Sequence, residues 1–410
     1  MENQKNDFLN GPILSPLLRF AGPVLLALFL QAMYGAVDLI VVGKFAGTAD
    51  ISAVSTGSQA MQLVTSLLVG LTTGVTVLLG QKIGKGRPDE AGNVVGSAIC
   101  LFVCVALALT ALLSALTEPF CRLLQAPEEA FVPTTQYVRI CSAGTLFIVA
   151  FNVIGSVRGL GDSKMPLITV AIACVTNIFG DLLLVDVFQM GAAGAALATV
   201  FAQAVSVILS LFVIMRRKLP FTFRKEQLRF DRPLTAGILR LGIPIALQDV
   251  LVGVSFLVIL AIVNSLGLLQ SAGMGIAEKV CAFVMLLPSA FSQSVSAFVA
   301  QNTGAGKPER AKKALRYSVA VSLCISVFVF YFNFFHGDLL AGIFANDHAV
   351  ILEAADYLKA YAIDCLLTSF LFCFVGYFSG LGKTVFVMAQ GILGAFGVRI
   401  PVSFAMSRLL

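Results

Sequence analysis

The chain has 410 residues, of which 58% are hydrophobic and only 12% are charged. Soluble domains carry about 25% charged residues, so this composition and the mean hydropathy of +0.93 predict an integral membrane protein. The net charge of +6 does not indicate a nucleic-acid-binding protein, because Lys and Arg gather in alternate loops between apolar runs, as membrane topology requires. No polar stretch is long enough for a soluble domain of about 50 residues, and we therefore expect the membrane part to carry the function.

Apolar windows of about 20 residues, the length that crosses a bilayer, predict an all-α protein with eleven membrane spans. The first window is too long for the core of a signal peptide and lacks a small-residue cleavage site, so we expect no cleaved leader. The nine cysteines lie almost wholly inside these windows and are interpreted as small buried hydrophobes. The windows are 17–43, 52–79, 94–116, 132–157, 165–186, 192–214, 238–262, 272–299, 314–336, 352–378 and 386–408.

Two sequence motifs recur at a nearly constant distance. Residues 81–91, which begin Gln-Lys-Ile-Gly-Lys-Gly-Arg-Pro, match residues 301–311 in the second half of the chain. The Gly-Leu-Gly motif at 159–161 returns at 380–382, almost the same distance further on. Repeats at a common shift predict two homologous halves, and six spans in each half make the repeat parallel, with a pseudo-twofold axis along the membrane normal.

The predicted organisation is an N-terminal lobe over 1–215, a basic linker over 216–240 and a C-terminal lobe over 241–410. The repeat predicts a twelfth span near 412–434, past the last residue, and we interpret its absence as a truncation. Basic residues follow every second span and are most numerous in the linker, so the positive-inside rule places the linker and the N-terminus in the cytoplasm. We expect a multi-pass protein of the cell membrane.

The repeated Gly-x-Gly-basic-Pro-acidic loop is typical of a tight turn between two helices. Glycine ends one helix, proline occupies the first turn of the next, and the acid complements that helix's N-terminus. The loop lacks the Gly-Lys-(Ser/Thr) ending of a P-loop and follows no strand. The sequence therefore does not support ATP-driven transport.

Acidic and amide residues within the first, fifth and sixth spans predict an ion site. Asp38 interrupts an apolar run, and an Asp near the centre of a membrane helix costs about 2.5 to 3.5 kcal/mol on insertion scales. Asn177 and Asp181 are four residues apart and share a helix face. Thr199 and Asn152 can add neutral oxygens, which together make a site for Na⁺ or a proton rather than for a transition metal.

Two neighbouring buried carboxyl groups favour protonation of one of them, which is what a proton-coupled carrier needs. With Na⁺ instead, Asp38, Asn177 and Asp181 would supply the ligands. A structural alternative stays open, in which Asp181 meets water at the outer loop and Asp38 is held by an ordinary hydrogen bond.

The second half does not repeat this site. At the shift of the Gly-Leu-Gly motif, Asn177 and Asp181 correspond to Val398 and Val402, and the nearest charged residue is Arg399. We expect Arg399 to pair with an acid, because a paired buried charge is less costly than an isolated one.

Other polar residues of the second half are candidates for a cargo cavity. Asp364 is the predicted partner of Arg399. Lys279, next to Glu278, is expected to form a similar pair with other residues, and Gln248 and Asp249 lie in the seventh span. These residues either line the cavity or hold helices in register. Both histidines, His336 and His348, belong to one loop, so neither a histidine proton relay nor a Ser-His dyad is predicted.

The Val-Asp-x-Ile-Val-Val-Gly segment at 37–43, the repeated Gln-x-x-Gly-x-Gly-x-Pro loops and the Arg-Gly-Leu-Gly-Asp-Ser-Lys segment at 158–164 together resemble the multidrug and toxic compound extrusion (MATE) family. The resemblance covers essentially the whole chain. It implies a V-shaped pair of six-helix lobes around a cavity that opens alternately to each side, with cation-coupled antiport.

The resemblance also implies functional residues. Asp38, Asn177, Asp181 and Thr199 match the positions that hold H⁺ or Na⁺ in the N-terminal lobe of family members. Some members place a glutamate in span 7 and an aspartate in span 10, and here Gln248, Asp249 and Asp364 match that second site only in part.

We therefore expect a secondary exporter of amphipathic, often cationic, small molecules, and not an enzyme. It would need no cofactor beyond H⁺ or Na⁺, and would work as a monomer in the lipid bilayer without nucleic acid. A lipid-linked precursor flippase of the same superfamily is the alternative, although mid-span basic residues are few. A membrane-embedded transferase ranks third.

Overall fold

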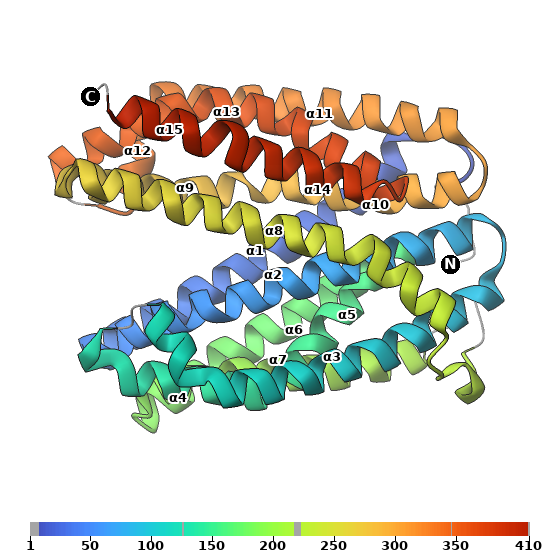
Figure 1. Cartoon of the computed structure of the whole chain (residues 1–410), viewed down its shortest axis with the longest axis horizontal. Helices are drawn as coiled ribbons and strands as arrows, with labels where there is room; N and C mark the ends of the chain where they lie inside the picture. Colours follow the sequence, from blue (N-terminus) through green and yellow to red (C-terminus); the bar gives the residue numbers. More distant parts are fainter. Residues whose placement is uncertain (1–7, 125–126, 217–222, 346, 409–410) are drawn as a thin grey trace. The chain divides into compact units, whose positions relative to one another are not determined.

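The computed structural model describes residues 8–124, 127–216, 223–345 and 347–408, and every regular element in these ranges is helical (Figure 1). Ten of these helical segments are long and apolar enough to cross a membrane, or eleven if one bent pair counts as a single span. The predicted all-α membrane protein is confirmed. Most helices extend beyond the predicted windows, because a hydropathy window detects only the apolar centre of a helix and not its polar ends.

The described chain divides into two compact units. One unit runs from Leu26 to Ala246, and the other joins the chain after Ala246 to the segment before Leu26. The two boundaries fall inside helices α1 and α8, shortly after Pro23 and Pro244, which the repeat relates to each other. The predicted division into lobes at 215/216 and 240/241 stays a prediction, and residues 217–222 of the linker lie outside the described residues.

The helices of the first half begin with α1 and continue to α7. The element between α4 and α5 is a bend of 59° at Gly144, where a Cβ atom would lie 2.4 Å from a methyl group of Val200 on α7. The bent pair is therefore the predicted fourth span. The elements are α1 (Leu14–Phe45), α2 (Thr48–Gly84), α3 (Pro88–Leu123), η2 (Glu128–Ala130), α4 (Phe131–Ala143), α5 (Thr145–Gly155), η3 (Ser156–Leu160), α6 (Lys164–Asp181), η4 (Leu182–Val187) and α7 (Gly191–Arg216).

The second half repeats this order, with the last span divided into three helical pieces. Figure 1 shows α11 and α13 running beside each other over most of their lengths. The elements are η5 (Lys225–Gln227), α8 (Arg232–Leu266), α9 (Leu268–Val284), α10 (Leu286–Gly304), α11 (Pro308–Phe335), α12 (Gly337–Gly342), α13 (His348–Gly380), α14 (Thr384–Ile392), η6 (Leu393–Arg399) and α15 (Ile400–Ser407).

The repeated glycine-proline loops are helix-to-helix turns, as predicted. Helix α2 ends at Gly84 and helix α10 at Gly304, and the glycines that follow, Gly86 and Gly306, both have φ of +68°. Residues with a Cβ atom rarely adopt this left-handed conformation. Proline then opens α3 and α11, with acids in the first turn of each.

The segment before α1 is hydrogen-bonded to the residues around the turn between α10 and α11. The Arg310 guanidinium donates to the backbone carbonyls of Phe8, Asn10, Gly11 and Pro12 at 2.7 to 3.2 Å. The Asn302 amide also donates to the Phe8 carbonyl, and the Phe8 ring packs against those of Phe20 and Phe298. These contacts hold the beginning of α1 in the unit formed mainly by the C-terminal half.

Within the other unit, α2 and the beginning of α8 approach each other through glycine. A Cβ atom on Gly70 would lie 2.3 Å from the Ala246 Cα, and one on Gly74 would lie 2.4 Å from the Ile238 carbonyl oxygen. Small residues four apart allow membrane helices to pack backbone against backbone.

We predict that Gly74→Ala destabilises the protein, because its new methyl group meets backbone atoms that cannot move aside. Overpacking of this kind costs about 1 to 3 kcal/mol. Thermal unfolding of the detergent-purified protein measures the effect. Gly275→Ala is the matched control, because a Cβ atom there has open space. Equal melting temperatures for the two variants would contradict the close approach.

Candidate functional site

Polar side chains from three helices meet inside the unit Leu26–Ala246. Asp38 comes from α1, Asn177 from α6 and Thr199 from α7. The Thr199 hydroxyl donates to the Asp38 carboxylate at 3.4 Å, and the Asn177 amide donates to the Thr199 hydroxyl at 3.4 Å. The structure thus brings together residues that lie up to 161 positions apart in the chain.

Asp181 completes this group from the last residue of α6, one turn after Asn177. Its carboxyl group lies close enough to that of Asp38 for the two to interact directly. Asp181 is 0% exposed and Asp38 is 6% exposed. The alternative in which Asp181 meets water at a loop is therefore wrong for this structure, and the two acids form one buried site.

Several oxygens of the site accept no hydrogen bond from any of the described residues. They are Asp38 Oδ1, Asn177 Oδ1 and both carboxyl oxygens of Asp181. Leaving one buried polar group unsatisfied costs about 1 to 3 kcal/mol, and more for a charged group. Hard oxygen ligands of this kind suit a proton or Na⁺, so the residues present fit the ion that the sequence predicted.

Further polar side chains that sequence analysis missed border the site. Tyr34 lies one turn before Asp38 on α1 and interacts with Gln203, which lies one turn after Thr199 on α7. The buried Tyr137 of α4 also lies close enough to Asp38 for an electrostatic interaction with its charge. Tyr34 lies four residues before Asp38 and Gln203 four residues after Thr199, so the helical spacing could have predicted both. No pattern in the neighbouring sequence marks Tyr137.

Asn152 has a different local partner. Its amide donates to the Ile148 carbonyl of its own helix, α5, at 2.8 Å. Its predicted part in the ion site stays a prediction.

A change of helical form follows directly after the site. Helix α6 ends at Asp181 and continues as the π-helical segment η4, and a second π-helical segment, η6, occupies the last span of the second half. Single π-helical turns are rare and frequently occur at functional sites. The two segments lie in corresponding spans but not at corresponding positions, because η6 matches residues 172–178 of α6 at the shift of the repeat.

The pairs predicted in the second half do not form. The Asp364 carboxylate accepts a hydrogen bond from the Thr368 hydroxyl at 3.1 Å, and none of the ion pairs among the described residues joins it to Arg399. Glu278 is half-buried and Lys279 is exposed, and none of the ion pairs among the described residues includes either of them.

Two other predicted residues lie on α8. A Cβ atom on Gly391 would lie 2.8 Å from the Gln248 Cγ, so the Gln248 side chain packs on α14. Its Oε1 atom is buried and accepts no hydrogen bond within the part of the chain that the structure describes. Asp249 is half-buried, and a role in a cavity stays a prediction.

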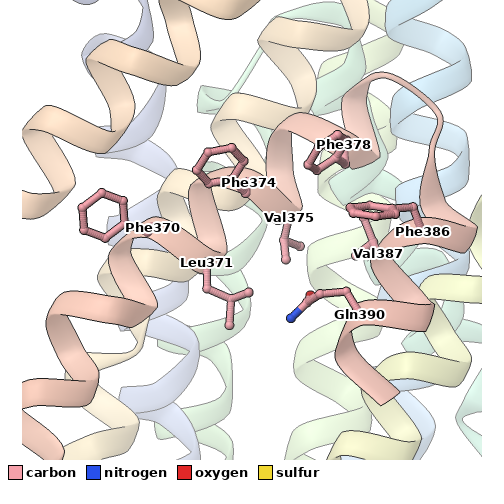
Figure 2. A pocket seen from close by; sticks show the side chains of 8 residues that line it. All are labelled: Phe370, Leu371, Phe374, Val375, Phe378, Phe386, Val387 and Gln390. Atoms are coloured by element: carbon pink, nitrogen blue, oxygen red, sulfur yellow. The ribbon is translucent and has the colours of Figure 1, made fainter. Parts of the chain in front are cut away.

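An aromatic cavity of about 270 Å³ lies between α13 and α14 (Figure 2). Side chains on one side of α13 face those of α14, and Gln390 is the only polar one in the lining that Figure 2 shows. Such a wall suits the flat apolar part of an organic molecule. The lining residues are Phe370, Leu371, Phe374, Val375, Phe378, Phe386, Val387 and Gln390.

Comparison with known families decides the identity. The MatE family model matches residues 23–183 and again residues 244–405. The chain belongs to the MatE family. The two matches begin at Pro23 and Pro244, which are separated by the same shift as the two Gly-Leu-Gly motifs, and the predicted resemblance and repeat are confirmed.

Curated relatives of this MatE chain match nearly its full length. It is 27% identical to the probable multidrug resistance protein YpnP of Bacillus subtilis over 98% of this chain and 91% of that protein. It is also 27% identical to an FAD transporter of Shewanella oneidensis, over 85% of this chain and 78% of that protein. The family is one of multi-pass membrane transporters, which supports the prediction of a transporter over an enzyme.

The fold has solved counterparts. A multidrug resistance MATE family transporter of the MOP superfamily, solved in an outward-facing conformation, superposes with a TM-score of 0.92 and 20% identity. The match covers 98% of this chain and 90% of that one.

We predict that Asp181→Asn raises thermal stability in sodium-free buffer. The substitution keeps the shape, removes one of two adjacent buried carboxyl groups and adds a donor beside unpartnered oxygens. Thermal unfolding in detergent measures the change.

The matched control is Asp356→Asn, at an exposed carboxylate 2.7 Å from Lys359. Exposed pairs contribute about 0 to 1 kcal/mol, so its melting temperature is expected to stay close to that of the wild type. If the melting temperature of Asp181→Asn is at or below that of the control, the inference that the two carboxyl groups of Asp38 and Asp181 destabilise the protein is wrong.

Proposed function

We propose that this MatE chain is a secondary active exporter, in which inward movement of H⁺ or Na⁺ drives amphipathic, often cationic, organic molecules outward by alternating access. The observation that carries the proposal is the group of buried, unpartnered oxygens on Asp38, Asn177 and Asp181 where three helices meet. A structure maintains such a destabilising arrangement where function requires it.

Ion binding would change the charge of the site without covalent chemistry. A proton or Na⁺ bound between Asp38 and Asp181 lowers their mutual repulsion and satisfies oxygens that otherwise lack partners. Because Asp38 lies on α1 and Asp181 on α6, occupancy changes how strongly α1 is held against α6. A ligand shifts a conformational equilibrium by its difference in affinity for the two states, and this coupling supplies that difference.

The relatives and the aromatic cavity support a small organic cargo. The relatives are described as multidrug resistance proteins or, in one case, as an FAD transporter. The phenylalanines of α13 and α14 provide an apolar surface to which flat molecules of several kinds can bind. We further propose that the protein lies in the cell membrane with its N-terminus in the cytoplasm, works as a monomer and needs no organic cofactor.

We predict that Asp38→Asn loses coupled efflux, because an amide cannot carry the charge that the coupling ion neutralises. The assay follows ethidium efflux from proteoliposomes, driven first by a proton gradient alone and then by a sodium gradient alone. The wild type should respond to at least one gradient, and Asp38→Asn should fall below about a tenth of that rate, a barrier change of at least about 1.4 kcal/mol.

Asp356→Asn serves again as control, because its exposed ion pair is remote from the coupling residues in the chain. It should retain wild-type efflux under both gradients. Normal gradient-driven efflux by Asp38→Asn would refute the proposal. The gradient that fails to drive the wild type is excluded as the coupling force.

A further inference from the structure

Arg399 is a cation inside a membrane-spanning segment, and its contacts are neutral. It is the last residue of the π-helical segment η6 and is half-buried. Its guanidinium donates to the Ser255 hydroxyl at 3.4 Å and lies 4.4 Å from the centre of the Phe256 ring. Among the described residues, none of the ion pairs includes Arg399.

The repeat places this contact at the position of the acidic site in the other half. At the shift that relates Pro23 to Pro244, Ser255 corresponds to Tyr34, and Arg399 corresponds to Ile178, the neighbour of Asn177. The contact between α8 and η6 therefore repeats the contact between α1 and α6. One half holds two carboxyl groups at this place, and the other half holds a guanidinium.

Among the described residues, Arg399 has no fixed counter-charge. Glu278 and Asp364 are the candidates, since Tyr357 interacts with the charges of both acids and with that of Arg399, and Glu278 is in none of the ion pairs between described residues. The Asp364 carboxylate is exposed and engaged with the Thr368 hydroxyl instead. The arginine thus has donors left for a ligand, beyond the one that Ser255 accepts, while its guanidinium lies over the Phe256 ring.

We propose that Arg399, together with Ser255 and Phe256, forms a binding site for the carboxylate or phosphate of an amphipathic aromatic molecule. The proposal rests on the proposed export function and specifies one class of its cargo. Molecules with an anionic group would then be cargo as well as the cationic ones.

The chemistry of arginine favours such a ligand. The planar guanidinium presents donors in a fork that matches two oxygens of a carboxylate or phosphate. The guanidinium lies 4.4 Å from the centre of the Phe256 ring, and one of its nitrogens donates to the hydroxyl of Ser255, a residue with 0% exposure. These two contacts position the guanidinium. Because a lone charge in an apolar medium is costly, an anion that neutralises it gains affinity that it would not gain in water.

The test compares two probes with the same flat apolar part and opposite charges. Pyrenebutyrate and pyrenylmethyl-trimethylammonium are titrated, by fluorescence anisotropy, against the full chain in neutral phosphatidylcholine nanodiscs. Arg399→Gln should weaken pyrenebutyrate binding about tenfold to a hundredfold, the loss typical of a charge-assisted hydrogen-bonded pair. Binding of the cationic probe should stay the same or tighten.

Two variants control for folding and for general charge. Arg408→Gln removes another arginine near the end of the same span, whose guanidinium lies 5.1 Å from the centre of the Phe404 ring. This variant should leave pyrenebutyrate affinity unchanged. Arg399→Lys keeps the charge and should retain more affinity than Arg399→Gln. Equal pyrenebutyrate affinities for wild type, Arg399→Gln and Arg399→Lys would overturn the proposal, as would equal losses in Arg399→Gln and Arg408→Gln.

A lipid phosphate carries the same charge, so a second set of nanodiscs contains phosphatidylglycerol. Unchanged pyrenebutyrate affinity in these discs supports a soluble ligand, and its loss would assign Arg399 to lipid and overturn the proposal. Because the measurement is equilibrium binding, failure here leaves ethidium efflux by the wild type intact. Failure of gradient-driven efflux would instead remove the proposed function.

Discussion

The cost of holding charge in an apolar medium governs the polar chemistry of this protein. Asp38 and Asp181 are buried together with oxygens that lack donors among the described residues, and the Arg399 guanidinium contacts a hydroxyl and an aromatic ring. Each of these groups would be less costly in water. The helices that carry them must therefore be stabilised elsewhere, and ions or cargo that neutralise them gain affinity from the same cost.

Close helix packing supplies that stabilisation, and glycine makes it possible. A Cβ atom on Gly159 would lie 2.4 Å from the Thr76 carbonyl oxygen in one unit, and a Cβ atom on the repeat-related Gly380 would lie 2.6 Å from the Ser296 carbonyl oxygen in the other. The left-handed turns at Gly86 and Gly306 set the direction of the next helix in each half. These repeated contacts form a common framework on which the two halves place different side chains.

The two halves use the same framework for opposite charges. The contact between the first and fifth spans holds acids, whereas its counterpart between the seventh and eleventh spans holds Arg399. Duplicated architecture with unlike sites permits one half to bind the coupling cation and the other to bind cargo. The aromatic cavity between α13 and α14 adds an apolar surface to the second half.

Hydropathy, the φ preference of glycine and four-residue spacing are local properties, so the spans, the glycine-proline turns and the repeat could be predicted from the residues alone. Grouping Asp38, Asn177, Asp181 and Thr199 from different spans also needed the family resemblance. The sequence did not reveal that Asp364 and Arg399 stay apart, that Tyr137 borders the acidic site, or that the boundaries of the compact units fall within α1 and α8. Contacts between helices depend on how far each helix is rotated and shifted along its axis. Neither quantity is encoded in the residues of one helix alone, since the packing against its neighbours determines both.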